Sequence, residues 1–278
     1  MPELPEVETI VRTLAPQVEG QRITAVTVLM QRSLQSGNEL LPLLVGGVIT
    51  KTHRRAKLLL LDVCAADGSD LVLAFHLKMT GRFFVHPPGT SPLKHTRLIV
   101  DLGPGGRLFF DDMRSFGWCR IMPTALLNSW PFWATLGPEP LECGASELAE
   151  HLTRQLTGKK RNIKACLLDQ TIIAGIGNIY ADEGLFRAGI APQRRAGDLQ
   201  HVELQALAEA VQNILSRAIQ ECGSSIRDYR DALGNAGAFQ NSFGVYGRKG
   251  KSCHVCGSEL KDGRVAGRGT VWCPVCQQ

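Results

Sequence analysis

Nucleophilic chemistry is possible at the start of the chain, which reads MPELPEVE. Removal of Met1 would leave Pro2 with a free secondary amine, and because an α-amino group titrates near pH ~8, much of it is neutral at neutral pH. Such an amine attacks the aldehyde carbon of a sugar and gives an iminium ion, which makes the neighbouring proton acidic. Glu3 lies beside this amine and Glu6 follows three residues later. A plain helix start fits the same residues, because acidic side chains in a first turn complement the helix dipole.

A metal site is indicated near the other end of the chain. Cys253 and Cys256 are separated by two residues, sixteen residues follow, and Cys273 and Cys276 repeat the spacing. Four thiolates at this spacing close a tetrahedral zinc site with no open position, so the metal is structural. The chain has nine cysteines, and the others are scattered in apolar surroundings. The odd total argues against a disulfide framework and for a reducing compartment.

The elements that must position these groups differ between the two halves of the chain. In the first half, an opening helix is predicted after Pro5, followed by short alternating strands with Gly and Pro clusters between them. The predicted strands are residues 23–28, 47–53, 57–63, 70–76, 82–86, 98–102, 107–111 and 118–122. Regularly spaced short strands favour an antiparallel β-sandwich with flanking helices over a parallel α/β sheet.

Helical periodicity dominates the second half. Prolines and tryptophans interrupt the strand pattern, and the predicted helices are residues 147–156, 162–168, 178–187 and a long helix that begins after Asp198 as its N-cap. Residues 223–240 are rich in Gly, Ser and Asn and predict a long loop. We therefore predict an α+β protein with a β-sandwich domain at 2–125, a hinge at 126–140, a helical domain at 141–240 and a zinc finger at 241–278.

Composition is that of a globular protein, with 44 % hydrophobic and 21 % charged residues among 278. The longest apolar run, residues 40–49, is too short to span a bilayer. No basic and apolar leader precedes it, so we expect neither secretion nor membrane insertion. The net charge of +5, with a pI near 8.8, permits nucleic-acid binding.

Five features, in order, resemble the formamidopyrimidine-DNA glycosylases, the bacterial enzymes that excise oxidised purines. They are MPELPEVET at residues 1–9, RRAK at 54–57, the two loops HLKMTG at 76–81 and DMRSFG at 112–117, GIGN at 175–178, and the paired cysteines at 253–276. Lys78 departs from the family, where glycine is frequent at this position. The resemblance covers the whole chain and implies a bifunctional glycosylase and abasic-site lyase, with a helix–two-turn–helix element around residue 178 and a β-hairpin zinc finger.

The resemblance also implies roles for individual residues. Pro2 would attack C1′ of a flipped nucleoside while Glu3 protonates the sugar ring oxygen, and Glu6 would support the site through water or hydrogen bonds. Lys57 and Arg268 would grip phosphates and assist β- and δ-elimination. The DNA contacts that it implies are His95 and Asn178, together with Met79, Arg114 and Phe116, which would fill the space that the flipped base leaves. Apart from the resemblance, Lys159, Lys160 and Lys164 carry positive charge near residue 178 and could neutralise phosphates, so Lys159 is a further expected DNA contact.

These features imply one structural zinc ion as the cofactor and double-stranded DNA with oxidised or abasic sites as the partner. We expect a monomer in the bacterial cytoplasm. The endonuclease VIII branch, which shares Pro2 but prefers oxidised pyrimidines, remains an alternative, although Leu4 and the Met/Arg/Phe set favour the purine branch. A non-catalytic protein that only binds damaged DNA is a second alternative, against which Pro2, Glu3 and Lys57 argue.

Plainer interpretations of single motifs also stay open. Residues 53–57 would fit a solvated basic strand edge, and the glycines of residues 175–178 would fit a tight helix–helix contact. Phe116 could fold back onto the sheet, and a methionine in a turn such as Met79 often only fills a gap.

Overall fold

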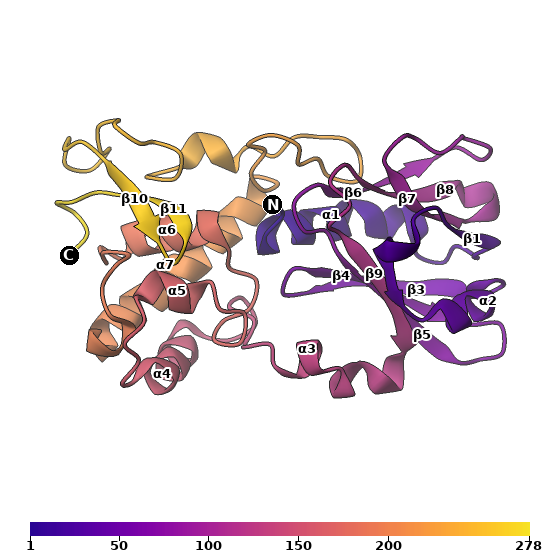
Figure 1. Ribbon diagram of the computed structural model, residues 1–278, viewed down its shortest axis with the longest axis horizontal. Helices are drawn as coiled ribbons and strands as arrows, with labels where there is room; N and C mark the ends of the chain where they lie inside the picture. The colour runs from indigo at the N-terminus through magenta and orange to yellow at the C-terminus, as the bar shows by residue number, and fades with distance from the viewer. The chain divides into compact units, whose positions relative to one another are not determined.

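Two units make up the computed structural model, which describes residues 1–278 (Figure 1). Unit 1 comprises residues 1–134 and 222–238, and unit 2 comprises residues 135–221 and 239–278. The sequence assigned residues 222–238 to the helical domain, whereas the structure groups them with the N-terminal unit. The reason is burial, because Tyr229 and Ala232 belong to the core of unit 1. The structure contains no helix with the length and apolar character needed to cross a membrane.

Unit 1 is built from one long helix and two sheets. The helix is α1 (Leu4–Val18), with Pro5 in its first turn. The strands are β1 (Ala25–Val28), β2 (Leu34–Ser36), β3 (Val48–Arg55), β4 (Leu58–Cys64), β5 (Asp70–His76), β6 (Gly81–His86), β7 (Thr96–Asp101), β8 (Arg107–Asp112) and β9 (Trp118–Pro123). One sheet has the order β2-β9-β5-β4-β3 and the other β1-β7-β8-β6. Only β2 and β9 pair in parallel, so the predicted antiparallel sandwich is confirmed.

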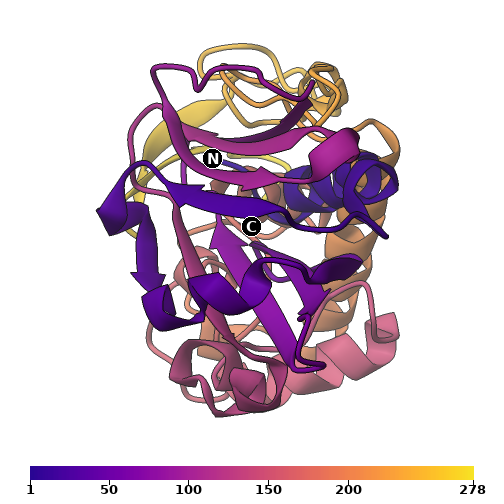
Figure 2. The same ribbon diagram turned by 90° about the vertical axis from the view of Figure 1, so that its right-hand side faces the viewer.

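A single core joins α1 to both sheets of unit 1. Figure 2 shows the two sheets as layers with α1 beside them. Val7, Ile10 and Leu14 of α1 are buried with Phe75 of the five-stranded sheet and Phe110 of the four-stranded sheet. This packing fixes the first turn of α1, where the predicted nucleophile lies, because helix and sheets share the same buried surface.

The outer face of the five-stranded sheet is covered by residues 124–134, which end the first of the two stretches of unit 1. This segment contains the short elements η4 (Thr124–Ser129) and α3 (Pro131–Ala134). Trp130 packs there on Trp118, with ring centroids 5.9 Å apart. The remaining short elements of unit 1 are η1 (Gln31–Ser33), η2 (Asn38–Leu40), α2 (Leu41–Leu44) and η3 (Gly103–Gly105).

Unit 2 consists of helices and one hairpin. The elements are α4 (Ala145–Leu156), α5 (Ile163–Leu167), α6 (Asn178–Arg187), η5 (Ala196–Asp198), α7 (His201–Gln220), η6 (Phe239–Ser242), β10 (Lys261–Val265) and β11 (Arg268–Trp272). Helix α7 packs on both α4 and α6. The predicted N-cap of the long helix is wrong, because Asp198 ends η5 and Gln200 is the N-cap. Gln200 takes that place because its backbone N–H donates to Glu203 Oε2 at 2.8 Å, which closes a capping box.

Candidate active site and nucleic-acid contacts

The predicted nucleophile and acid lie at the first turn of α1. Pro2 is buried and Glu3, the residue that precedes the helix, is 2 % exposed, whereas Met1 is exposed. The backbone N–H of Glu3 donates to Glu6 Oε2 at 2.8 Å. This bond closes the first turn and fixes the direction in which the chain enters the helix. Removal of Met1 would therefore leave the Pro2 amine on a segment whose backbone is already held.

Glu6 ties this turn to the returning segment of unit 1. Its Oε1 accepts the backbone N–H of Ser224 at 2.7 Å, and the Tyr229 hydroxyl lies 3.4 Å from the Glu6 carbonyl oxygen. Burial, and then the Glu6 charge, raise the pKa of Tyr229, so its hydroxyl stays protonated. Gly223 approaches Glu6 so closely that a Cβ there would lie 3.0 Å from the glutamate Cγ. Through these contacts Glu6 holds the backbone of the first turn of α1 against the segment around residues 223–229.

Lys57 occupies the two-residue turn between β3 and β4, since Arg55 pairs with Leu58. Ala56, the other turn residue, has φ of 53°, the left-handed region that L residues rarely adopt. Arg54 holds this turn, because its Nη1 donates to the Ala56 carbonyl oxygen at 2.9 Å. Its Nε also lies 3.2 Å from Glu8 Oε2 of α1. The basic motif is thus not a solvated strand edge, because the Arg54 side chain is only 6 % exposed and Lys57 is buried.

His76, which the sequence analysis did not single out, lies beside the predicted site residue Lys57. It lies directly across from Leu58 in the register of β4 and β5, next to Lys57. Its Nδ1 accepts the backbone N–H of Lys78 at 3.1 Å. Burial, followed by the charges of Lys78 and Lys57, lowers the pKa of His76 to about 3, so the imidazole is neutral. Only the strand register, which the motif HLKMTG does not reveal, brings it beside Lys57.

The predicted wedge residues (Met79, Arg114 and Phe116) lie together although they come from two loops. Met79 is 44 % exposed and Phe116 is 53 % exposed, so Phe116 does not fold back onto the sheet. Arg114 Nη1 lies 2.8 Å from the Met79 sulfur, and its Cζ lies 4.7 Å from the centroid of the Phe116 ring. A thioether, a cation and an aromatic ring therefore form one protruding group. His95 lies on a third loop, with its Nδ1 3.3 Å from Arg97 Nη2.

In unit 2, Asn178 and Arg268 are brought close to each other. Asn178 opens α6, and its Nδ2 donates to the carbonyl oxygen of Gly269 at 3.0 Å. Gly269 directly follows the exposed Arg268 in β11. The β10–β11 turn consists of Ala266 and Gly267, because Val265 pairs with Arg268. Both turn residues have positive φ, 53° and 70°, as a type I′ turn requires.

Lys164 is buried and is not available to a phosphate, so its predicted role is wrong. Its ammonium lies 2.7 Å from Asp182 of α6, and both side chains are almost fully buried. The ammonium also donates to Thr270 Oγ1 at 2.7 Å and to the Gly269 carbonyl oxygen at 3.2 Å. Burial raises the pKa of Asp182, and the Lys164 charge opposes this. Lys159, by contrast, is half-buried in the turn after α4.

The four predicted zinc ligands converge. The Sγ atoms of Cys253, Cys256, Cys273 and Cys276 all lie within 4.8 Å of one another. Tetrahedral zinc has Zn–S bonds of about 2.3 Å, which place sulfurs about 3.8 Å apart, and the Cys253–Cys276 separation is 3.9 Å. The four thiols therefore fit one zinc ion without an open position for substrate.

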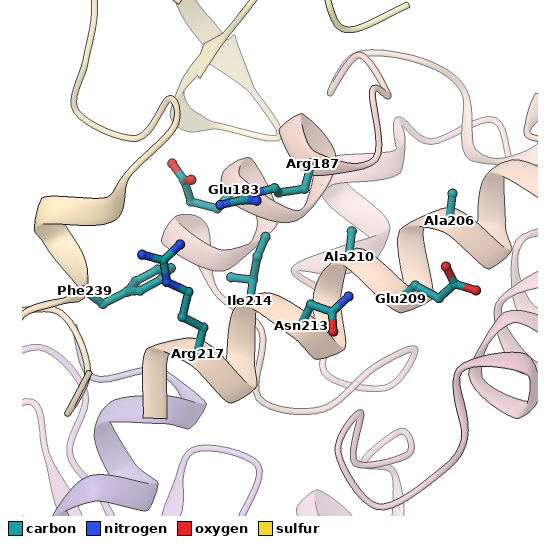
Figure 3. Close-up of a pocket in the computed structure, with 9 residues that line it drawn as sticks. All are labelled: Glu183, Arg187, Ala206, Glu209, Ala210, Asn213, Ile214, Arg217 and Phe239. Atoms are coloured by element: carbon teal, nitrogen blue, oxygen red, sulfur yellow. The ribbon is translucent and has the colours of Figure 1, made fainter. Parts of the chain in front are cut away.

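A cavity of about 360 Å³ in unit 2 is lined by none of the predicted site residues. Figure 3 shows Glu183 and Arg187 extending from α6, with Arg217 on α7. The Glu183 carboxylate accepts the backbone N–H groups of residues 244–246, at 2.8 to 2.9 Å. Glu183 thus holds the segment that leads into the hairpin.

Three family models match the chain. Residues 1–119 match the formamidopyrimidine-DNA glycosylase N-terminal domain, and residues 136–230 match the formamidopyrimidine-DNA glycosylase H2TH domain. Residues 250–278 match the zinc finger found in FPG and IleRS. The matches follow one another in the order in which the motifs appear in the sequence.

Curated proteins and solved structures agree with the family models. A formamidopyrimidine-DNA glycosylase of Nitratidesulfovibrio vulgaris is 56 % identical over 214 residues, which are 77 % of this chain and 58 % of that longer protein. The enzyme of that name from Desulfitobacterium hafniense is 43 % identical over 279 residues and covers both chains completely. The crystal structure of a Lactococcus lactis FPG mutant in complex with a Fapy-dG-containing DNA has a TM-score of 0.91, 36 % identity and complete coverage of both chains.

Proposed function

The chain belongs to the formamidopyrimidine-DNA glycosylase family, and from this membership we propose how its residues divide the work of base excision. It is a DNA glycosylase for oxidised purines in base excision repair and an abasic-site lyase. Its partner is double-stranded DNA that contains oxidised or abasic sites. The zinc finger takes one structural zinc ion.

The chemical step begins with the Pro2 amine, which becomes free when Met1 is removed. The nitrogen lone pair forms a bond to C1′ of the flipped nucleoside, and Glu3 donates its proton to the sugar ring oxygen as the ring opens. The amine nitrogen then loses its proton, and its lone pair expels the base, which leaves with the electrons of the C1′–base bond and takes up a proton. The resulting iminium ion acidifies the C2′ proton, so its loss expels the 3′ phosphate by β-elimination. A second elimination then expels the 5′ phosphate.

The observation that carries this proposal is the constrained first turn of α1. Glu6 holds the Glu3 backbone N–H and the Ser224 backbone N–H at once, which supports a fixed position for Pro2 and Glu3 before DNA binds. A preorganised nucleophile and acid need no reordering in the reaction. Glu6 acts as the supporting residue.

Phosphate binding falls to residues from both units. Lys57 and Arg268 hold phosphates of the damaged nucleotide and stabilise the charge that develops on the leaving oxygens. Lys159 and Asn178 contact further phosphates, and His95 contacts the DNA. The wedge residues fill the space that the flipped base leaves, with Arg114 facing the orphaned base. We further propose that the enzyme acts as a monomer in the cytoplasm, where its DNA substrate lies and thiolates stay reduced.

Borohydride reduction tests the nucleophile. The enzyme is mixed with an 8-oxoguanine:cytosine duplex and reduced, and the adducted peptide is identified by mass spectrometry. We expect the adduct on a peptide that begins at Pro2, and a loss of trapping of more than tenfold in Pro2→Gly. Pro16→Ala, at the exposed far end of α1, is the matched control. Full-rate trapping by a chain that retains Met1 would overturn the proposal.

Two further measurements test the substrate and the phosphate contacts. A thymine glycol duplex, compared with the 8-oxoguanine duplex, distinguishes this function from that of the endonuclease VIII branch. Salt dependence of duplex binding tests Arg268, because each neutralised phosphate contributes about 0.9 to the slope of log K against log salt. Arg268→Ala is expected to lower that slope by about 1, and an unchanged slope would contradict the contact.

A further inference from the structure

One buried side chain joins the three loops that carry the proposed DNA contacts of unit 1. Asp112 is 0 % exposed, at the end of β8. The loop after β5 carries Met79, the loop before β7 carries His95, and the loop after β8 carries Arg114 and Phe116. The proposed function assigns no role to Asp112, although it opens the DMRSFG motif.

The Asp112 carboxylate holds both wedge loops. Its Oδ1 accepts the Thr80 hydroxyl of the first loop and the backbone N–H of Arg114 at 3.1 Å. The other oxygen, Oδ2, accepts the backbone N–H of Gly117 at 2.6 Å. Thr80 Oγ1 also accepts the Arg114 N–H at 3.0 Å. The two loops are therefore joined at Asp112, directly beneath the exposed wedge side chains.

The backbone of Asp112 holds the third loop. Its N–H donates to the carbonyl oxygen of His95 at 2.9 Å, and its own carbonyl oxygen accepts Arg97 Nε at 2.9 Å. Arg97 in turn lies 3.3 Å from His95 Nδ1. A single residue thus connects the His95 loop with the wedge loops.

Backbone geometry indicates that the wedge loops need this support. Lys78, which precedes Met79, has φ of 50°. Ser115, which lies between Arg114 and Phe116, has φ of 53°. Non-glycine residues occupy this region only when surrounding contacts hold them there. At Gly117 a Cβ would lie 3.0 Å from Asp112 Oδ2 and 2.8 Å from the Phe110 ring, so the loop approaches the carboxylate as closely as glycine permits.

We propose that Asp112 is a positioning residue that locks the two wedge loops together, so that Met79, Arg114 and Phe116 enter the duplex as one rigid body. This inference rests on the wedge role given under the proposed function. Ordering the loops before DNA binding removes the cost of ordering them during base flipping. Asparagine at this position would present an amide N–H₂ to one of the backbone N–H donors. The hydrogen bond from that loop to residue 112 would then be lost.

The test compares two substrates of which only one needs a wedge. Excision from an 8-oxoguanine:cytosine duplex requires insertion, whereas cleavage of a single-stranded abasic oligonucleotide does not, because it has no stack to fill. Asp112→Asn is expected to slow duplex excision at least tenfold and to leave single-strand cleavage within about twofold of the parent. Fluorescence of 2-aminopurine beside the lesion reports the insertion step directly, and it should slow by the same factor.

Matched variants separate positioning from loss of fold. Asp111→Asn, on the neighbouring residue of β8, is the control and is expected to leave both rates unchanged. Thr80→Val removes the hydrogen bond from the Thr80 hydroxyl to Asp112. It should slow duplex excision less than Asp112→Asn does and leave single-strand cleavage unchanged. Thr80→Ser keeps the hydroxyl and should excise from the duplex at the parent rate. Equal losses on both substrates, or no loss on the duplex, would overturn the inference.

Failure of the wedge assignment gives a different result. In that case Phe116→Ala would leave the 2-aminopurine signal and duplex excision unchanged, whatever Asp112→Asn does. Failure of the proposed chemistry is distinct again, since the parent enzyme would then form no borohydride adduct.

Discussion

Two turns that position the proposed phosphate-binding cations, one in each unit, have one backbone feature in common. Ala56 precedes Lys57 between β3 and β4, and Ala266 with Gly267 precedes Arg268 between β10 and β11. Both alanines have φ of 53°. Since this left-handed conformation costs an L residue about 1–2 kcal/mol, neither turn is stable through its own sequence alone.

The two turns differ in what supports them. The Lys57 turn ends two strands of a five-stranded sheet with a buried core, and Arg54 ties it to Glu8 of α1. The Arg268 turn ends a two-stranded hairpin, which is marginally stable on its own. It is supported by the cysteine cluster and by Lys164, which bonds beside it. Where a large core is lacking, a turn with alanine in the left-handed region is therefore held by a metal site and a buried ion pair.

Zinc removal is the strongest way to separate the two turns. A structural zinc supplies about 10–16 kcal/mol in small fingers, so chelation should unfold β10 and β11 and abolish tight DNA binding. Unit 1 should stay folded, because its core contains no zinc ligand. Hydrogen exchange is the measurement, with loss of amide protection at Lys261–Val265 and retained protection at Leu58–Cys64. Equal loss in both strands would contradict the comparison.

Breaking the buried ion pair should have the next largest effect. Lys164→Met leaves Asp182 buried without its cation, and such a change costs about 3–5 kcal/mol. The Lys164→Met, Asp182→Leu double variant should recover most of the loss, because both charges are then removed together. Denaturant unfolding measures both, with the exposed neighbour Lys160→Met as control. A loss below about 1 kcal/mol in Lys164→Met would show that the pair does not support the hairpin.

The sequence predicted most of the local features because they depend on spacing. Cysteine spacing predicted the zinc ligands, and alternation predicted the strands, although β2, with only three residues, gave too short a pattern. Lys159 and Lys164 could not be told apart, because the burial of Lys164 depends on Asp182, eighteen residues further along the chain and on another helix.

The features that the sequence did not predict depend on contacts between segments far apart in the chain. His76 joins Lys57 only through the register of β4 and β5. Residues 223–240 were predicted as a loop. The place of residues 222–238 in unit 1 depends on the burial of Tyr229 and Ala232 and on contacts such as that from Ser224 to Glu6, 218 positions away. No periodicity encodes such pairings.

Acid should lower the free energy of unfolding of unit 1, which contains the Lys57 turn, because His76 is buried there in its neutral form. Its pKa is about 3 in the folded protein and 6.5 in the unfolded chain, so its contribution to stability is complete above pH 6.5. It is lost progressively as the pH falls from 6.5 towards 3, because only the unfolded chain then binds the proton. At about pH 5 the loss is about 2 kcal/mol. Unfolding of the parent and of His76→Gln across this range measures it, and a parallel pH dependence in both would exclude His76 as the cause.

Glycine substitution gives the smallest and most symmetrical test of the two turns. Ala56→Gly and Ala266→Gly each relieve about 1–2 kcal/mol of left-handed strain, offset by about 0.5–1 kcal/mol for the added freedom of the unfolded chain. We expect a gain of up to about 1.5 kcal/mol in each zinc-loaded variant, measured by denaturant unfolding. Ala210→Gly, within helix α7, is the control and should lower the free energy of unfolding.

After chelation the gain from Ala56→Gly should persist and that from Ala266→Gly should vanish, because a turn that has unfolded stores no strain to relieve. Persistence of both gains would mean that the hairpin keeps its turn without the metal.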